Sequence, residues 1–294
     1  MGLDRLFLRL PQLPVRIARE SDLRSRLATL QVANKYGRSP ITHPGGPIVS
    51  LTTHGERAQT VHLAIESIGR GQLRPSRLIL WLDDQSLLTR LSAGLRRLQT
   101  RGLEVKRCEN YGPHKKYYPY IESHDIIDAP LVTADDDLIY PQSWLRDLME
   151  AFQHFPDVVN CHRARVMILN DNGIAKYDTW EPPTSTVPSF RHFSTGVAGA
   201  IYPPSFLRAL KTQATAFLSC CPRADDIWLH LQALRSGHKV RQVNTQPFRL
   251  RYIPGTQSNG LLRENLSLGG NDVQIEATYQ LADIAKLRQA ESII

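Results

Sequence analysis

The chain has 294 residues, of which 41% are hydrophobic, and a formal net charge of +8. This length can bury a sizeable core in one large domain or two small ones, and the composition excludes general disorder. The excess of basic residues favours anionic partners such as nucleotide phosphates, acidic lipid surfaces or nucleic acid, without choosing among them.

No apolar stretch in the sequence is long enough to cross a bilayer, and the start of the chain lacks the apolar core of a secretory signal. The four cysteines have neither a C-x-x-C spacing nor a Cys/His spacing suited to zinc. We therefore expect reduced thiols rather than a disulfide framework, and a cytoplasmic protein.

Residues 1–46 are predicted to form a basic leader and a linker rich in proline and glycine. In the leader, arginines alternate with leucines and a phenylalanine, as in a basic segment that lies at a membrane interface. On that interpretation, residues 1–30 contact the inner face of the membrane peripherally. The same pattern fits an ordinary surface helix packed on the domain and broken at Pro11 and Pro14, and the residues leave both interpretations open.

After the linker, apolar runs typical of strands alternate with segments of helical spacing. Strands are predicted over residues 48–53, 77–82, 103–108 and 130–134, and helices over 57–68, 86–99 and after Lys115. Such alternation predicts an α/β fold, with a mostly parallel sheet between helices. We place a single catalytic domain at residues 47–245 and a C-terminal extension at residues 246–294.

The second half of the domain and the extension after it are less regular. Helices are predicted over 142–155, 225–234 and 272–288, and strands at 158–159, 165–169, 195–202 and 239–243, with a turn at 170–173 and a loop over 180–189. The glycines of the 195–202 strand permit close approach of backbone or ligand.

Three consecutive carboxylates, Asp135, Asp136 and Asp137, follow the apolar run that ends at Ala134. Because side chains alternate along a strand, Asp135 and Asp137 are expected on one side and Asp136 on the other. An Asp-x-Asp pair suits Mg²⁺ or Mn²⁺, whose shell is often completed by water and substrate phosphates. Taken alone, the three acids favour a solvated acidic turn, and only the rest of the chain shifts the balance toward a metal site.

Further polar groups fall where other strands end, or in the loop before the acidic cluster, and ligands of open α/β sheets gather at that edge. They are Thr52 and Thr53, Asp83, and the pair Lys115 and Lys116, whose ammonium groups could reach phosphates. Asp225 and Asp226 open a predicted helix, where acids also occur simply as capping residues.

In this order, five segments resemble the family 2 glycosyltransferases of GT-A fold. They are Ile48–Arg57, Leu78–Asp83, the DXD motif in Val132–Asp137, the glycine-rich strand ending at Tyr202-Pro203, and Ala224–Asp226. The resemblance covers roughly residues 47 to 245. It implies transfer of a sugar from a nucleotide-sugar donor to a hydroxyl of a glycan or lipid-linked acceptor, with cell-surface polysaccharide synthesis as a family-level expectation.

The resemblance also implies roles for individual residues. Asp135 and Asp137 would hold Mn²⁺ or Mg²⁺, with Asp136 facing the ribose or supporting the metal ligands. Asp83 would contact the nucleoside in a pocket lined by Thr52, Thr53 and Arg57, while Lys115 and Lys116 offset charge on the leaving diphosphate. Asp226 would be the general base of an inverting reaction, with Asp225 as the alternative because the family often has Glu-Asp here.

Two other functions fit part of the sequence. A sugar-1-phosphate nucleotidyltransferase would also bind a nucleotide and Mg²⁺, but a glycine-rich, basic loop to cradle a triphosphate is missing after the first strand. A non-catalytic protein that binds nucleic acid or an anionic surface would explain the charge, but no nucleic-acid-binding motif occurs and the acids cluster. We therefore expect an enzyme without a nucleic-acid partner.

Overall fold

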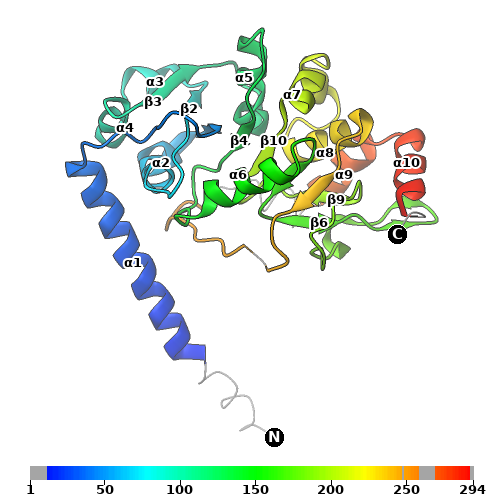
Figure 1. Cartoon of the computed structure of the whole chain (residues 1–294), viewed down its shortest axis with the longest axis horizontal. Coiled ribbons are helices and arrows are strands. Elements are labelled where there is room, and N and C mark those ends of the chain that lie inside the picture. The colour runs from blue at the N-terminus through cyan, green and yellow to red at the C-terminus, as the bar shows by residue number, and fades with distance from the viewer. Residues whose placement is uncertain (1–11, 247, 258–268, 292–294) are drawn as a thin grey trace, which may run out of the picture.

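The computed structural model describes residues 12–246, 248–257 and 269–291 (Figure 1). At its centre is a seven-stranded sheet with the strand order β11-β5-β10-β4-β1-β2-β3. Its strands are β1 Ile48–Thr52, β2 Arg77–Leu82, β3 Leu103–Arg107, β4 Leu131–Thr133, β5 Val159–Cys161, β10 Ala200–Tyr202 and β11 Val240–Gln242. β10 is antiparallel to β4 and β5, and the other pairs are parallel, so the predicted α/β fold with a mostly parallel sheet is confirmed.

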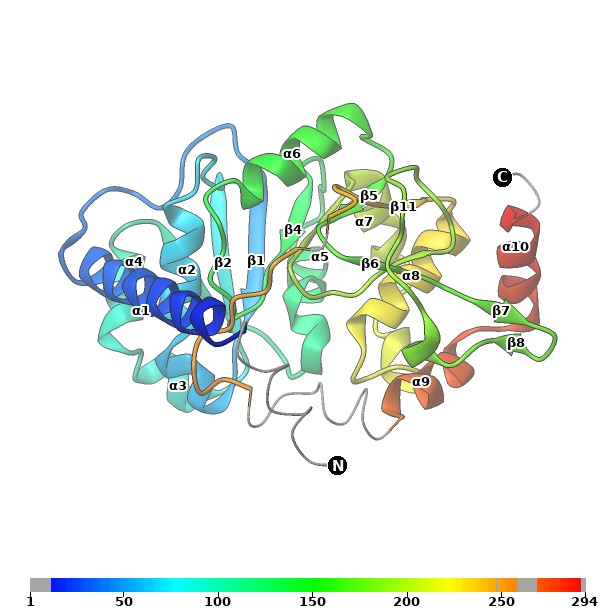
Figure 2. The same cartoon turned by 90° about the horizontal axis from the view of Figure 1, so that it is seen from below.

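Helices cover both faces of this sheet (Figure 2). The α-helices are α1 Gln12–Tyr36, α2 Val61–Gly69, α3 Gln85–Thr89, α4 Ala93–Gln99, α5 Tyr118–Ser123, α6 Trp144–His154, α7 Pro204–Lys211, α8 Asp225–Ser236, α9 Gly270–Thr278 and α10 Leu281–Glu291. Short 3-10 helices are η1 Gly55–Gln59, η2 Gly112–Lys116, η3 Tyr177–Thr179 and η4 Ala216–Ser219. Two small sheets pair β6 Ala164–Val166 with β9 His192–Ser194, and β7 Leu169–Asn170 with β8 Gly173–Ile174.

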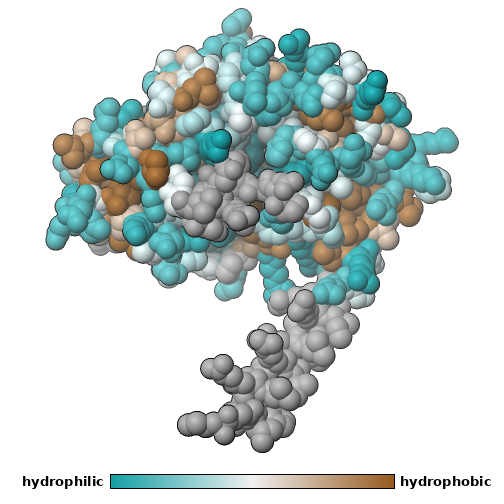
Figure 3. Space-filling view, turned by 180° about the vertical axis from the view of Figure 1, so that it is seen from behind, coloured by the Kyte–Doolittle hydropathy of each residue, from teal (hydrophilic) through white to brown (hydrophobic). Residues whose placement is uncertain are grey.

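Two separate hydrophobic cores lie on the two faces of the sheet. Successive residues of a strand point to opposite faces, so they belong alternately to one core and to the other. Val49 and Leu51 of β1 pack with residues of α2, α4 and α6. Ile48 of the same strand joins the opposite core, which includes residues of α5, α7 and α8. Figure 3 shows the face opposite to Figure 1, where hydrophilic side chains predominate and hydrophobic ones form separate patches.

The strand order reverses between β1 and β4. From β1 the sheet continues to β2 and β3 on one side, and from β4 it continues to β10, β5 and β11 on the other. In open α/β sheets, the carboxyl ends of strands at such a switch point leave a crevice in which ligands bind. Residues 53–57 and 134–137 leave the sheet at this place.

The leader contributes one continuous helix, α1, whose N-terminal half projects away from the body of the protein (Figure 1). The predicted break at Pro14 is wrong, because proline is tolerated in the first turn of a helix; Pro11 lies outside the described residues. Further along α1, Leu30 packs with Leu63 and Ala64 of α2 and with Ile253. None of the described helices is long and apolar enough to span a membrane.

Two predicted helices are divided in the structure, and one predicted strand is shorter than expected. The 86–99 segment forms α3 and α4, because Ser92 starts a new helix by accepting a hydrogen bond from the Leu95 N–H at 3.4 Å. The 272–288 segment forms α9 and α10, and the Asp283 carboxylate accepts a hydrogen bond from the Gln280 N–H at their junction (2.9 Å). The 195–202 strand shrinks to Ala200–Tyr202, because three of the preceding five residues have positive φ angles.

Candidate active site

The three consecutive aspartates lie just beyond the carboxyl end of β4 and are buried, with exposed fractions of 8%, 5% and 5% for Asp135, Asp136 and Asp137. A solvated acidic turn is therefore excluded. β4 ends at Thr133, so the expected alternation of the three side chains does not extend through the cluster. Each carboxylate instead has its own set of donors, and those donors come from four different parts of the chain.

Asp136 connects the ends of β4 and β1. Its Oδ2 accepts a hydrogen bond from the Thr53 hydroxyl at 2.6 Å, and its Oδ1 accepts one from Nη1 of Arg57 at 3.0 Å. The same guanidinium nitrogen lies 3.1 Å from Oδ2 of Asp137. The neighbouring Thr52 does not join this cluster, because its hydroxyl donates to the backbone carbonyl of Trp81 at 2.9 Å.

Both predicted lysines are paired with carboxylates. Nζ of Lys116 lies 2.6 Å from Oδ1 of Asp135, and Nζ of Lys115 lies 2.5 Å from Oδ1 of Asp83. Desolvation alone would lower the pKa of Lys116, but the negative charges of Asp135 and Asp225 raise it. The sequence thus brings Asp83, both lysines and the acidic cluster to one edge of the sheet.

The lysines are held in place by their neighbour His114. Its imidazole is fully buried, stacks on Phe217 with ring centroids 4.0 Å apart, and contacts the Tyr117 hydroxyl and the Cys221 carbonyl, each at 2.8 Å. Burial lowers the pKa of His114 to about 4, so this ring is neutral at pH 7. These contacts of His114 attach the 3-10 helix η2 to the segment before α8. They therefore fix the position of the backbone that carries Lys115 and Lys116.

Asp137 is the least compensated member of the acidic cluster. Its Oδ2 accepts a hydrogen bond from Nε2 of Gln257 at 2.8 Å. Burial and the charge of Asp135 nevertheless raise the pKa of Asp137 to about 6, against the opposing effect of Arg57. A divalent cation would favour the ionised form of this carboxylate.

The cluster fits a metal site only in part. Within the described residues, no group of three His, Cys, Asp or Glu side chains is arranged to hold a metal ion. Mg²⁺ and Mn²⁺ are commonly bound through one or two carboxylates, with water and phosphate oxygens filling the other positions. Asp137 can supply one carboxylate, and Asp135 can supply a second if Lys116 moves from it to a phosphate.

Asp225 and Asp226 begin α8 but have different surroundings. Ala224 occupies the N-cap position without a side-chain hydrogen bond, so neither acid is the capping residue. Asp225 is buried, and its charge interacts with Lys116 and Asp135; burial raises its pKa. Asp226 is half-buried and close to Gly196, on which an added Cβ would lie 3.6 Å from that of Asp226. Burial, and next the charge of Asp225, raise the pKa of Asp226 to about 8.

The glycine-rich loop 195–199 lies beside both acidic groups, the cluster 135–137 and the pair Asp225 and Asp226. Ala198 has a φ of 75°, and its backbone N–H donates to Oδ2 of Asp135 at 3.1 Å, while its carbonyl accepts from Nε1 of Trp144 at 2.7 Å. Gly199 cannot be larger, because a Cβ would lie 2.7 Å from the Trp144 ring. The glycines therefore serve backbone geometry beside the acidic cluster, rather than an extended strand.

Several groups of this site were not predicted from the sequence. Gln257 and Thr256 belong to the extension after residue 245, and the Thr256 carbonyl accepts a hydrogen bond from Nε of Arg57 at 3.0 Å. The Tyr140 hydroxyl accepts one from the Asp135 N–H at 2.6 Å. Gln257 and Thr256 carry no local signal, since their role depends on contacts with residues more than a hundred positions earlier.

Searches against models of protein families and against curated protein sequences find no match for the chain. Among solved structures, the chain is similar to a mannosyltransferase from Pyrobaculum calidifontis in complex with GDP-Man and Mn²⁺, with a TM-score of 0.47 and 13% identity over 92% of this chain and 85% of that one. It is also similar to an inositol-1-phosphate CTP transferase from T. maritima, with a TM-score of 0.46 and 12% identity over 76% of this chain and 96% of that one.

A third similar structure is a CMP:2-keto-3-deoxy-manno-octonic acid synthetase complexed with CTP, with a TM-score of 0.40 and 11% identity over 77% of this chain and 98% of that one. Glycosyltransferases and nucleotidyltransferases thus appear at equal distance. Similarities with TM-scores below 0.5 do not separate these two classes, so the functional argument rests on the residues of the site.

Proposed function

We propose that this protein is a nucleotide-sugar-dependent glycosyltransferase that moves a sugar to a hydroxyl of a glycan or lipid-linked acceptor. The observation that supports this most is the meeting of two acidic groups from distant parts of the chain around one lysine. Asp135 lies 2.6 Å from Nζ of Lys116, and the charge of Asp225 acts on the same ammonium group. A transferase of this kind needs one site for a leaving diphosphate and a separate base for the acceptor.

The donor nucleotide would lie in the crevice between the carboxyl ends of β1 and β4. Asp83 would contact the nucleoside, with Thr52, Thr53 and Arg57 forming the wall of that pocket. Lys115 and Lys116 would turn from their carboxylate partners to the phosphates, because flexible ammonium groups can follow a developing negative charge. Asp136 would fix Thr53 and Arg57 and so support the metal ligands.

Asp137 and Asp135 would hold Mn²⁺ or Mg²⁺. When bound, the cation would supply positive charge to the diphosphate oxygens. In this arrangement Lys116 leaves Asp135 free for the cation as it moves to the phosphate. The raised pKa of Asp137 supports this assignment, because burial and the charge of Asp135 disfavour its ionised form and a bound cation would offset both effects.

Asp226 would accept the proton of the attacking hydroxyl. Its pKa of about 8 makes it a stronger base than an ordinary aspartate, and it is half-buried near the glycine-rich loop. Asp225 would act as a positioning residue, since its charge interacts with Lys116 and raises the pKa of its neighbour Asp226. Direct attack with a single base inverts the anomeric centre, so we propose an inverting reaction.

A thermal-shift series followed by an assay of products tests this function. We expect nucleotide sugars to raise the melting temperature only with Mn²⁺ or Mg²⁺, because a ligand bound to the native state stabilises it by mass action. With an acceptor present, the glycosyltransferase would release a nucleoside diphosphate. Stabilisation by a nucleoside triphosphate, and release of inorganic diphosphate from it in the presence of a sugar 1-phosphate, would instead identify a nucleotidyltransferase.

A further inference from the structure

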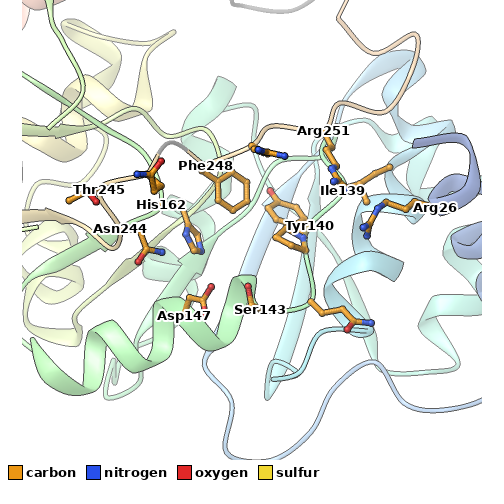
Figure 4. A pocket seen from close by; sticks show the side chains of 14 residues that line it. Arg26, Ile139, Tyr140, Ser143, Asp147, His162, Asn244, Thr245, Phe248 and Arg251 are labelled. Atoms are coloured by element: carbon orange, nitrogen blue, oxygen red, sulfur yellow. The ribbon is translucent and has the colours of Figure 1, made fainter. Parts of the chain in front are cut away.

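A cavity of about 730 Å³ lies beside the acidic cluster, between α1, the start of α6 and the chain after β11 (Figure 4). Tyr140, whose hydroxyl accepts a hydrogen bond from the Asp135 N–H, belongs to its wall. None of the proposed donor or base residues lines it. Its wall includes Arg26 of α1, His162, Phe248, Arg249 and Arg251. Figure 2 shows the orange chain that follows β11 crossing toward α1. The volume is that of a small-molecule site.

Positive charge predominates around this cavity. Its described lining contains three guanidinium groups and one carboxylate, Asp147. Asp147 is paired with Arg146, whose Nη2 lies 2.7 Å from its Oδ1. Arg26 and Arg251 share a single carboxylate, that of Asp22, at 3.0 Å each. Arg249 is exposed. One acid shared by two guanidiniums leaves an excess of positive charge available to a ligand.

The rest of the wall combines rings with uncharged polar side chains. The rings are those of Tyr140, His162 and Phe248, and the polar side chains are those of Gln142, Ser143, Asn244, Thr245 and Gln246. His162 is buried, and its Nε2 donates to the Trp144 carbonyl at 2.9 Å. Its ring lies against that of Phe248, with centroids 4.8 Å apart, and Tyr140 lies on the other side of Phe248 in Figure 4. A ligand here would therefore have an anionic group for the arginines and an uncharged part for the aromatic rings.

The chain that forms the cavity also reaches the acidic cluster. The Ile139 N–H donates to the Arg251 carbonyl at 2.8 Å, and the Ile253 N–H donates to the Asp137 carbonyl at 2.7 Å. Four residues later, Gln257 donates to the Asp137 carboxylate. Residues 248–257 thus run from the wall of the cavity to the Asp137 carboxylate.

We propose that this cavity is a second anion site, which binds a phosphate group carried by an organic molecule. Planar guanidinium groups match the oxygens of phosphate and form charge-assisted hydrogen bonds with them. The organic part would lie against Phe248 and Tyr140. The phosphate can belong to a soluble phosphorylated compound or to an acidic lipid head group, because the projecting α1 contributes Arg26 to the same wall. This site does not depend on the proposed transferase function.

Binding to the full-length protein, without nucleotide or divalent metal, tests the proposal. The soluble probes are inorganic phosphate and glycerol 3-phosphate, measured by calorimetry, and the lipid probe is flotation with vesicles of phosphatidylglycerol against phosphatidylcholine. We expect saturable binding of at least one probe. Arg249→Gln should weaken it about ten-fold or more, the worth of a charge-assisted hydrogen bond. Arg249 is exposed, so this variant should fold normally, which circular dichroism would confirm.

A control variant outside the cavity and a double variant of the two other arginines in its wall test whether binding depends on the cavity. Arg90→Gln removes the same charge from an exposed position outside the cavity and should bind as the wild type does. Arg26→Gln with Arg251→Gln should weaken binding further than Arg249→Gln alone. Arginine-dependent binding of glycerol 3-phosphate would identify a soluble ligand, and arginine-dependent flotation alone would identify a lipid head group. The proposal is overturned if no probe binds, or if all variants bind equally.

Discussion

Nζ of Lys116 lies 2.6 Å from Oδ1 of Asp135, and both side chains are largely buried. Each charge therefore compensates the other in the free protein. In the proposed complex, Lys116 would bind the diphosphate and Asp135 would bind the cation. In the proposed donor site, this ion pair would have to open before the phosphate and the cation could bind. Its energetics give the first prediction.

Lys116→Gln should lower the free energy of unfolding by about 3 kcal/mol, because it leaves the carboxylate of Asp135 buried without its partner. Mn²⁺ should stabilise this variant more than the wild type, since the cation can replace the missing charge. Chemical denaturation with and without Mn²⁺ measures both effects. Lys106→Gln is the control, because Lys106 and its partner Glu104 are more exposed (38% and 31%) and the loss should stay below about 1 kcal/mol. An equal response of both variants to Mn²⁺ would contradict the assignment of Asp135.

Asp136 and Asp137 are adjacent, yet replacing each of them with asparagine should change the free energy of unfolding in opposite directions. At pH 7.5, Asp136→Asn should destabilise the protein by about 2 kcal/mol, because the hydrogen bonds from Thr53 and Arg57 lose their charged acceptor. Asp137→Asn should stabilise the metal-free protein by up to about 3 kcal/mol and abolish metal-dependent nucleotide binding. Calorimetric titration with a nucleoside diphosphate and Mn²⁺ measures the second effect.

The stabilisation expected for Asp137→Asn follows from the sign of its pKa shift. The folded protein raises the pKa of Asp137 to about 6, so the native state binds this proton more tightly than the unfolded chain does. Ionisation of Asp137 above pH 6 therefore costs stability, and the asparagine variant avoids that cost. The advantage should disappear as the pH falls below about 4, where the carboxyl is protonated in both states. A pH-independent difference would show that the shift is not its cause.

The sequence allowed the scaffold of the site to be predicted, because local patterns determine it. The apolar run over residues 77–82 predicted the bounds of β2, and the polar residues at the ends of β1, β2 and β4 do meet at one edge. A parallel sheet brings the carboxyl ends of its strands together, so this part follows from periodicity alone.

The rest depends on contacts between distant residues, which local patterns do not encode. Gln257 lies in a stretch without periodicity, and only the return of the chain across Ile139 places it at Asp137. Asp225 and Asp226 look equivalent in the sequence, but in the structure Asp225 is buried and its charge interacts with Lys116, whereas Asp226 lies near Gly196. The assignment of Asp226 as the base stays a prediction.

A further prediction concerns a buried ion pair that supports the first half of the sheet. Nη1 and Nη2 of Arg101 lie 2.7 and 3.0 Å from the two carboxylate oxygens of Glu66, and the side chains are 6% and 0% exposed. Glu66→Gln should lower the free energy of unfolding by about 3–5 kcal/mol, because it leaves the guanidinium of Arg101 buried and unpaired. Urea denaturation measures this loss.

The control for Glu66 is Glu104→Gln. Glu104 makes a similar two-pronged contact with Arg77, but both side chains are 31% exposed and solvent screens the pair. Its loss should cost less than about 1 kcal/mol. A loss of similar size in both variants would mean that burial does not decide the worth of these ion pairs.

The last prediction concerns the proposed base. A base must be deprotonated to accept a proton, so the rate of sugar transfer should rise with pH through the pKa of Asp226, which burial and Asp225 raise to about 8. Asp226→Asn should lose roughly two to four orders of magnitude in transfer and keep nucleotide-sugar binding. Steady-state rates between pH 6 and 9, with binding measured in parallel, separate these effects.

Asp225→Asn distinguishes a positioning role from a catalytic one. Removing the charge of Asp225 eliminates one of the causes that raise the pKa of Asp226, so the rising limb of the pH profile should move to lower pH while transfer persists. A purely structural role for Asp225 would lower the rate at every pH without moving the limb. If instead Asp225→Asn abolishes transfer and Asp226→Asn retains it, the base is Asp225. If both variants transfer sugar at the wild-type rate, neither acid is the base and the proposed inverting mechanism is contradicted.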